Sequence, residues 1–373
     1  MPRREHVMRA DQALVRRRII MSGSKLAAMR ETAEALLDSG KGILAADESL
    51  PVVRERFAAI GLHSSTQNRR AYREMLFRTP HIADFISGAI LFDETIRERA
   101  ADGIPMIDIL KGQGVIPGVT VDRGTKSLAL FPGERITEGI DGLRYRLMEY
   151  KELGARFTKW RAVVKIGHQI PSPACIGANV NLLACFSALS QEAGLLPVVE
   201  PEVLFEGDHT LSLCEDITNR VLRALFHTLE DYRVDLAAVI LKANMVTPGS
   251  HCRKQASVEE VAFATLHCLR DSVPRQVPGI VFLSGGQTEA EATARLNAIG
   301  QLSSGPWKLS FAFGRALKES ALRIWEGLQS NVPEAQRVLL HRAWCNSLAQ
   351  GGQYNPEMEH TSIQPREAVA LCA

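Results

Sequence analysis

Several features that would assign this sequence quickly to a class are missing. It contains no run of eighteen apolar residues, and arginines interrupt the apolar residues near its start, so neither a membrane-spanning helix nor a secretory h-region is expected. Its net charge of +2 provides no broad basic surface for a nucleic-acid backbone. We therefore expect a soluble, cytoplasmic protein that binds neither membranes nor nucleic acids.

Cysteine and histidine occur without the spacings typical of disulfide frameworks or metal sites. The seven cysteines are an odd number and include no CxxC pair. The ten histidines show no HxxxH, HEXXH or HxH spacing. These patterns predict a reducing compartment, no metal site and no cofactor.

The two ends differ in composition from the rest of the chain. The first 30 residues carry eight Lys or Arg against two acids, and because Ser is scarce there a solvated basic extension over residues 1–23 is favoured over a transit peptide. Residues 351–373 have no periodic pattern and predict a loose tail. No linker or internal repeat divides the part between, which predicts one domain over 24–350.

Eight short apolar runs recur along that domain, each followed by a segment with helical spacing of apolar residues. Strands that alternate with helices pair in parallel, and eight such units predict an α/β fold of the (β/α)8 TIM-barrel type. The runs cover residues 43–46, 89–92, 115–121, 157–166, 196–200, 239–241, 280–283 and 309–313.

Polar residues follow these strands at or just past their C-terminal ends, where barrel enzymes place reactive groups. A single acid there is typical of a helix N-cap or turn, so the joint pattern carries the argument. The residues are Asp47, Glu48, Asp122, Glu200, Glu202, Lys242, Ser284, Gly285, Gly286, Gly314 and Arg315.

Two strands carry lysines where a barrel has no solvated edge. Alternation over 157–166 places Lys159, Arg161 and Lys165 on one face, which we expect to point into the barrel's mouth or its inner layers. Lys242 stands alone at the end of an apolar run and either extends its amine to the rim or lies near Lys159. In the second case, desolvation and like charge would favour a free amine, which attacks carbonyl compounds to give a Schiff base.

Acidic and glycine-rich segments complete the pattern. Glu200 and Glu202 lie on one face of their strand, and they either transfer protons or neutralise nearby cations; both roles fit an active site. The turn Ser284-Gly285-Gly286 opens a helix and predicts a phosphate site, to which Arg315 adds a guanidinium. Together these residues predict a barrel that binds a phosphorylated carbonyl compound beside a nucleophilic lysine.

At these residues the sequence closely resembles the class I, Schiff-base-forming fructose-bisphosphate aldolases. The matching stretches include GKGILAADES (40–49), ARFTKWRAVVKI (155–166), PVVEPEVL (197–204), LKANMVTPG (241–249), VFLSGGQTEAEA (281–292) and FGRALKESAL (313–322). The resemblance spans about residues 40–350. It implies a (β/α)8 barrel, a homotetramer, and reversible cleavage of fructose 1,6-bisphosphate in glycolysis and gluconeogenesis.

The resemblance also implies a role for each matching residue. Lys242 forms the imine with C2 of dihydroxyacetone phosphate, Glu200 is the general acid/base with Glu202 in support, and Asp47 exchanges the proton of the C4 hydroxyl. Lys159 supplies positive charge near Lys242. The implied substrate-binding residues are Arg161, Ser284, Gly285, Gly286, Gly314, Arg315, Ser49 and Arg56.

Three departures concern the far phosphate and the tail. Val52 and Glu55 stand where the family usually has a hydroxyl and a lysine, and Thr120 stands where it usually has a lysine. Each lost charged contact could cost about 1.5–3 kcal/mol of binding free energy. The chain ends Leu371-Cys372-Ala373 instead of in the family's frequent tyrosine.

The departures leave two alternatives to a fructose 1,6-bisphosphate aldolase. One is an aldolase for fructose 1-phosphate or another ketose phosphate, because only the far-phosphate side is altered. The other is a barrel that binds a sugar phosphate or a protein without turnover, which the retained Asp47, Lys159, Glu200 and Lys242 disfavour.

Overall fold

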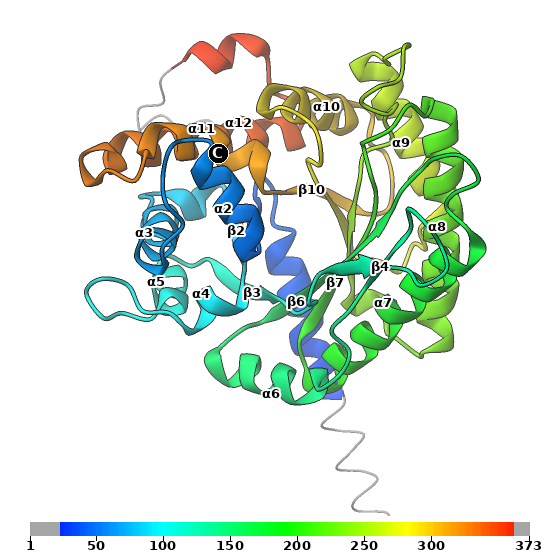
Figure 1. The fold of residues 1–373 in the computed structure, drawn as a ribbon, viewed down its shortest axis with the longest axis horizontal. Coiled ribbons are helices and arrows are strands. Elements are labelled where there is room, and N and C mark those ends of the chain that lie inside the picture. The colour runs from blue at the N-terminus through cyan, green and yellow to red at the C-terminus, as the bar shows by residue number, and fades with distance from the viewer. Residues whose placement is uncertain (1–22, 362–373) are drawn as a thin grey trace, which may run out of the picture.

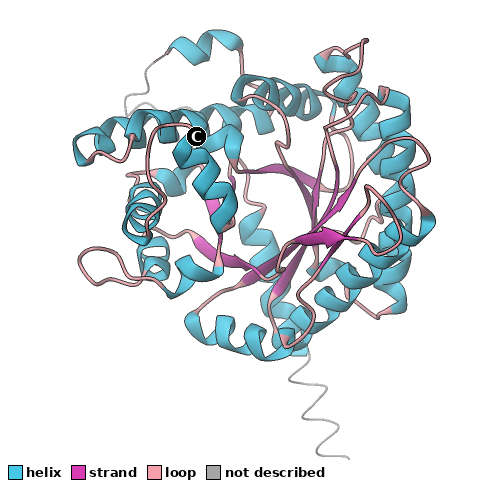
Figure 2. Ribbon diagram, viewed as in Figure 1, coloured by secondary structure: helices cyan, strands magenta, loops and turns pink. Residues whose placement is uncertain are grey.

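The structure is a computed structural model that describes residues 23–361. All eight predicted runs form strands of one closed parallel barrel in the order β1-β10-β9-β8-β7-β6-β3-β2, and β1 pairs with β10 through Ile43 and Ala312 (Figures 1 and 2). This confirms the predicted (β/α)8 fold class. The barrel strands are β1 (Gly42–Ala46), β2 (Ile86–Leu91), β3 (Ile116–Thr120), β6 (Phe157–Val164), β7 (Leu196–Val203), β8 (Ile240–Ala243), β9 (Gly279–Phe282) and β10 (Lys308–Phe313).

Helices surround the barrel and cover its outer face (Figure 2). They are α2 (Leu50–Ala58), α3 (Thr66–Phe77), α4 (Asp93–Arg97), α5 (Met106–Gly112), α6 (Leu143–Leu153), α7 (Pro173–Ala193), α8 (Leu211–Asp231), α9 (Val258–Ser272), α10 (Glu289–Leu302), α11 (Arg315–Trp325) and α12 (Val332–Gln350). Helix α7 is long and apolar enough to cross a membrane by length and composition. It packs between α6 and α8 over β6 and β7, as a core helix of a barrel does.

One end of the barrel is filled by a helix at residues 23–36. Its Met29, Ala33 and Leu36 join Phe157 and other inward-facing strand residues in an apolar core separate from the core between strands and helices. A Cβ atom at Gly88 would overlap Leu36, so glycine at that strand position admits the helix. The sequence argument predicted the domain but not this closure.

The alternation of side chains carries each strand from this apolar core to a charged layer at the opposite end. On β7, Leu196 and Val198 lie in the inner core, and the next inward positions are Glu200 and Glu202. On β8, Ile240 lies in the same core and Lys242 follows two residues later. The C-terminal ends of the strands therefore gather the charged residues.

Three parts of the structure differ from the sequence expectations. Strand β6 ends at Val164, so Lys165 is exposed and does not join the mouth. Residues 125–127 and 135–137 form a small antiparallel hairpin, β4 (Thr125–Ser127) with β5 (Arg135–Thr137), whose strands are too short for an alternation signal.

The segment expected to be a loose tail contacts the outer helices through Tyr354, Met358 and Glu359. Tyr354 is buried and its hydroxyl donates to Glu359, which also forms an ion pair with the buried Arg342 of α12. These contacts hold the segment against the barrel's outer helices. The rest of the tail lies outside the described residues, and it includes the C-terminal end where the family's tyrosine is replaced. Most of the predicted basic extension at 1–23 lies outside them as well.

Candidate active site

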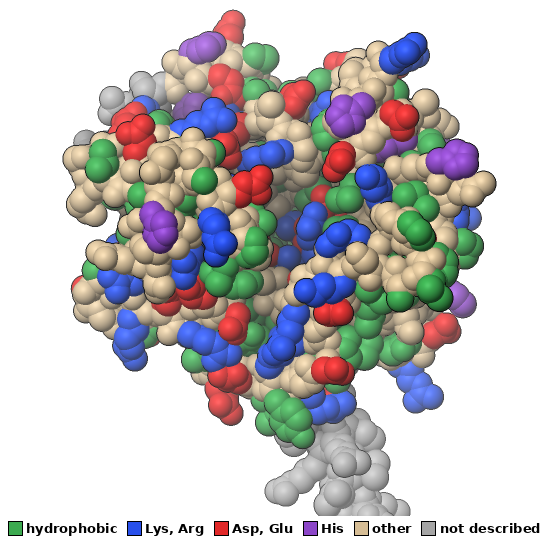
Figure 3. Space-filling view, in the orientation of Figure 1, with side chains coloured by type: hydrophobic (Ala, Val, Ile, Leu, Met, Phe, Trp, Pro, Cys, Tyr) green, Lys and Arg blue, Asp and Glu red, His purple; other side chains and the backbone are tan. Residues whose placement is uncertain are grey.

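A cleft of about 1440 Å³ opens at the C-terminal ends of the strands. Figure 3 shows it as a hollow in the centre of this face, with Lys and Arg side chains gathered around it. Every predicted site residue lines the cleft: Asp47, Ser49, Arg56, Lys159, Arg161, Glu200, Glu202, Lys242, Ser284, Gly285, Gly286, Gly314 and Arg315. The fold thus brings together residues from six strands and the loops that follow them.

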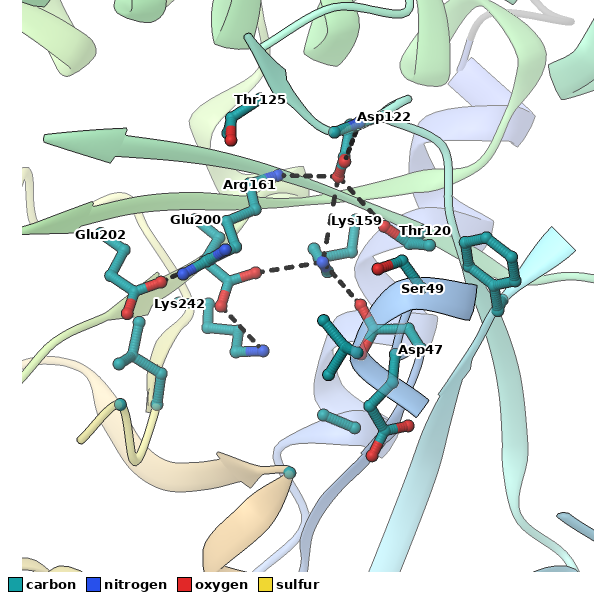
Figure 4. Close-up of a pocket in the computed structure, with 18 of the residues that line it drawn as sticks. Asp47, Ser49, Thr120, Asp122, Thr125, Lys159, Arg161, Glu200, Glu202 and Lys242 are labelled. Carbon is teal, nitrogen blue, oxygen red and sulfur yellow. Dashed lines mark hydrogen bonds and ion pairs between the residues drawn. The ribbon is translucent and has the colours of Figure 1, made fainter. Parts of the chain in front are cut away.

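Lys159 of β6 lies at the centre of the charged layer (Figure 4). Its Nζ is 2.6 Å from Asp47 Oδ2, 3.3 Å from Glu200 Oε2 and 3.9 Å from Asp122 Oδ2. Burial lowers the pKa of Lys159, but the surrounding carboxylates outweigh burial and raise it above its ordinary value. Lys159 is therefore a fixed positive charge at neutral pH.

Lys242 lies on the other side of Glu200. Its Nζ is 3.0 Å from Glu200 Oε1, and both side chains are 5% exposed. Glu200 thus bridges the two lysines, with one carboxylate oxygen toward each. The 3.0 Å contact places Lys242 Nζ within proton-transfer distance of a carboxylate oxygen.

The structure separates the two glutamates that the sequence placed side by side. Glu202 forms an ion pair with Arg161 Nε, whereas Glu200 forms ion pairs with Lys159 and Lys242. Burial raises the pKa of Glu200, but Lys242, Lys159 and Arg161 more than offset burial and lower it. Each glutamate therefore has its own cation, which favours the ionised form of Glu200.

Asp47 follows β1 and faces the cleft with Lys159 (Figure 4). Burial raises its pKa, but the ammonium groups of Lys159 and Lys242 reverse that effect and lower the pKa below its ordinary value. Asp47 is therefore a carboxylate that can accept a proton. Asp122, which the strand pattern indicated but to which the resemblance gave no role, accepts hydrogen bonds from the hydroxyl of Thr120 and the backbone N–H of Arg161.

Ser284, Gly285 and Gly286 form a turn on the cleft wall. The backbone N–H groups of Gly285 and Gly286 have no acceptor within residues 23–361, which leaves them available to an anion. Helix α10, which begins just after the turn, is closed by a capping box between Thr288 and Glu291.

The helix terminus that is open to the cleft belongs to α11 instead. Its N-cap is Gly314, no side chain caps it, and its first turn has no acid. The expected phosphate site therefore combines the glycine turn with the start of α11 and Arg315, not with the start of α10.

A second buried charge cluster surrounds Glu48 at the edge of the cleft. Its carboxylate forms ion pairs with Arg56 Nη1 at 2.8 Å, with Arg73 Nη1 at 2.7 Å and with Lys318 Nζ. Burial raises the pKa of Glu48, but these cations hold it well below its ordinary value. Burial lowers the pKa of Lys318 to about 7 against the opposing effect of Glu48.

Sequence reasoning missed Arg73 and Lys318 because they lie within amphipathic helices. In the sequence, each resembles an ordinary charged residue on the solvent-exposed face of a helix. On α3 the fold buries Arg73 but not Arg69, one turn earlier, so helical spacing gave no signal for Arg73. Within the described part of the chain, no three His, Cys, Asp or Glu side chains are arranged to hold a metal ion.

Comparison with known proteins places this arrangement in a family. Residues 28–370 match the family described as "Fructose-bisphosphate aldolase class-I". The "Probable fructose-bisphosphate aldolase class 1" of Xylella fastidiosa strain 9a5c is 52% identical over 327 residues, which cover 87% of this chain and 98% of that protein. The cytoplasmic isozyme of fructose-bisphosphate aldolase from Spinacia oleracea is 48% identical over 84% of this chain and 88% of its own.

A solved structure agrees with both sequence comparisons. Fructose-bisphosphate aldolase from Plasmodium falciparum, crystallised in complex with TRAP and a small-molecule inhibitor, superposes with a TM-score of 0.88 at 42% identity. The alignment covers 89% of this chain and 96% of that one. With the barrel, the lysine pair and these matches in agreement, the chain belongs to the class-I fructose-bisphosphate aldolase family.

Proposed function

We propose that the barrel's mouth cleaves fructose 1,6-bisphosphate reversibly to dihydroxyacetone phosphate and glyceraldehyde 3-phosphate through an imine on Lys242. The observation that carries this proposal is the buried carboxylate of Glu200 shared by Lys242 and Lys159. A lysine beside an ionised base and a second, permanently charged lysine is suited to nucleophilic attack on a ketone.

Imine formation begins with proton transfer from the Lys242 ammonium to Glu200. The free amine attacks the C2 carbonyl and gives a carbinolamine. Glu200 then returns its proton to the departing hydroxyl, which leaves as water, and the C=N bond forms. Each step uses the 3.0 Å contact between Lys242 and Glu200.

Cleavage requires a base at the C4 hydroxyl, and Asp47 has the right charge state for it. As Asp47 takes that proton, the C4 carbonyl forms, the C3–C4 bond breaks and its electron pair moves into the imine to give an enamine. Lys159, 2.6 Å from Asp47, keeps the carboxylate ionised beforehand.

The two phosphates would bind at opposite ends of the cleft. Gly285, Gly286 and Arg315 hold the phosphate on C1, and Ser49 with Arg56 lies toward the other. Arg56 already pairs with Glu48, and Thr120 donates to Asp122, so neither of these positions offers the far phosphate an unpaired cation. This favours keeping a ketose 1-phosphate aldolase as the second candidate, and the ratio of kcat/KM on the mono- and bisphosphate decides between them.

Borohydride trapping tests the imine. Incubation with dihydroxyacetone phosphate and borohydride, followed by peptide mass analysis, should place the adduct on Lys242, with turnover of fructose 1,6-bisphosphate in the presence of a chelator. K242M should abolish both, whereas K165M, which changes an exposed lysine just past the end of β6, should leave both intact. An adduct elsewhere, or turnover by K242M, would contradict the assignment.

We also propose a cytoplasmic homotetramer. Family resemblance supports the tetramer, and the cytoplasmic isozyme among the relatives supports the location. Light scattering of the purified chain should give four times its 41.0 kDa mass. A monomeric mass would refute the assembly without affecting the imine.

A further inference from the structure

One fully buried lysine takes no part in the steps above. Lys318 lies on α11 with a side-chain exposure of 0%, and its Nζ donates to the backbone oxygen of Ala45 at 2.5 Å and to the carboxylate of Glu48. Burying an ammonium group costs free energy that its contacts must offset. Both contacts lie at the same short stretch of chain.

That stretch contains the proposed base for cleavage. Ala45 precedes Asp47 by two residues and Glu48 follows it directly, so Lys318 contacts the backbone before Asp47 and the side chain of the residue after it. Asp47 itself has an ion pair with Lys159 at its carboxylate end. Lys159 thus contacts the Asp47 side chain directly, whereas Lys318 contacts the two neighbouring residues, Ala45 and Glu48.

The same helix begins at the proposed phosphate site. Gly314 is the N-cap of α11 and Arg315 its first residue, and Lys318 lies one turn later, on the same side of the helix as Arg315. A displacement of α11 would therefore move the phosphate contacts and the Asp47 segment together.

We propose that Lys318 is a positioning residue that couples the phosphate-binding start of α11 to Asp47 and so sets the rate of carbon–carbon bond cleavage. This inference rests on the proposed function. It separates two parts of the reaction, because imine formation with dihydroxyacetone phosphate uses Lys242 and Glu200 and involves no C4 hydroxyl. Among the described residues, neither Lys242 nor Glu200 contacts Lys318.

The charge balance of the cluster makes Lys318 a feasible target. Glu48 keeps Arg56 and Arg73 as ion-pair partners when Lys318 is replaced, so no carboxylate is left buried without a cation. K318M keeps most of the side-chain volume and removes the donor, and K318Q keeps an N–H donor without the charge. K308M serves as the matched control, since Lys308 is exposed at the other end of β10, the strand that leads into α11.

The experiment measures two rates for each full-length variant at saturating substrate, so that a change in phosphate affinity affects neither. They are steady-state cleavage of fructose 1,6-bisphosphate and inactivation by borohydride with dihydroxyacetone phosphate. We expect the ratio of cleavage to trapping to fall about 10- to 100-fold in K318M, because a small misplacement of a catalytic group costs that much. K318Q should recover part of the loss, and K308M should match the unsubstituted chain.

Three results would overturn the proposal. The first is an unchanged ratio in K318M, and the second is an equal loss of both rates in K318M, which would mean that Lys318 only supports the fold. The third is a ratio in K318Q that is no higher than in K318M. Where K318M does not fold, the ratio in K318Q alone decides: a fall supports the proposal and a normal ratio refutes it. Absence of a Lys242 adduct in the unsubstituted chain would refute the proposed function first, and that result is distinct from all of these.

Discussion

At the scale of single residues, Gly286 is the most constrained position of the proposed phosphate site. Its φ of +78° lies in the left-handed region, and a Cβ atom there would overlap the ring of Phe205. Phe205 lies in the loop after β7 and also lines the cleft. The turn therefore has its shape because glycine alone fits between that ring and the cleft.

Replacing Gly286 should affect both binding and stability. We expect G286A to raise KM for phosphorylated substrates and to lower the free energy of unfolding by about 1–3 kcal/mol, because the turn must shift. Steady-state kinetics and urea unfolding measure the two effects. G177A is the control: a Cβ at Gly177 of α7 meets nothing within 4 Å, so that change should leave KM alone and stabilise by up to about 1 kcal/mol. A normal KM in G286A would place the phosphate elsewhere.

The sequence predicted the site wherever strand alternation reaches the mouth. Lys159, Glu200 and Lys242 each lie two residues beyond an inward-facing position of their strands, so their direction followed from the pattern. The prediction for Lys165 was wrong because this residue lies beyond Val164, the last paired residue of β6. The partners of Glu48 could not be predicted, since contacts between remote helices and a strand end leave no local pattern.

At the scale of elements, the helix at 23–36 determines how the barrel is filled. Leu36 is fully buried among inward-facing residues of several strands. The choice between the barrel's end and its outer face depends for such a helix on small residues such as Gly88, far along the chain. The barrel class was predictable because strands and helices alternate locally along the chain. The closing helix was not, because its position depends on contacts with distant residues.

Truncation of Leu36 should weaken the fold without touching the chemistry. We expect L36A to lower the free energy of unfolding by about 2–5 kcal/mol, the usual cost of a cavity in a well-packed core. E34A, at an exposed position of the same helix, should stay within about 0.5 kcal/mol. Chemical denaturation followed by circular dichroism measures both. Equal stability of the two variants would show that the helix does not close the barrel.

At the scale of the whole molecule, the mouth concentrates buried carboxylates that are stable only when ionised. Asp47, Glu48 and Glu200 all have pKa values below their ordinary 3.8 or 4.5. The folded chain therefore binds fewer protons at acidic pH than the unfolded chain does. Their contribution to stability is complete above the ordinary values and is lost as the pH falls through the lowered ones.

We therefore expect the free energy of unfolding to decrease steadily below about pH 4.5. Urea denaturation at a series of pH values between about 3 and about 6 measures the slope. E48Q should be less stable at pH 6 and should have a shallower slope, because one of the three carboxylates no longer titrates. A slope in E48Q equal to that of the unsubstituted chain would mean that Glu48 is not ionised in its cluster.

The helix at 23–36 also has a consequence for biosynthesis. It leaves the ribosome before any strand, yet the core that buries it includes Val281 of β9 and Ala312 of β10. Its apolar face therefore stays in water until almost the whole barrel has been translated. Contacts so distant in sequence form slowly. During that interval the nascent chain exposes an apolar surface near its start that is prone to aggregation. We expect molecular chaperones to bind this surface until the barrel closes.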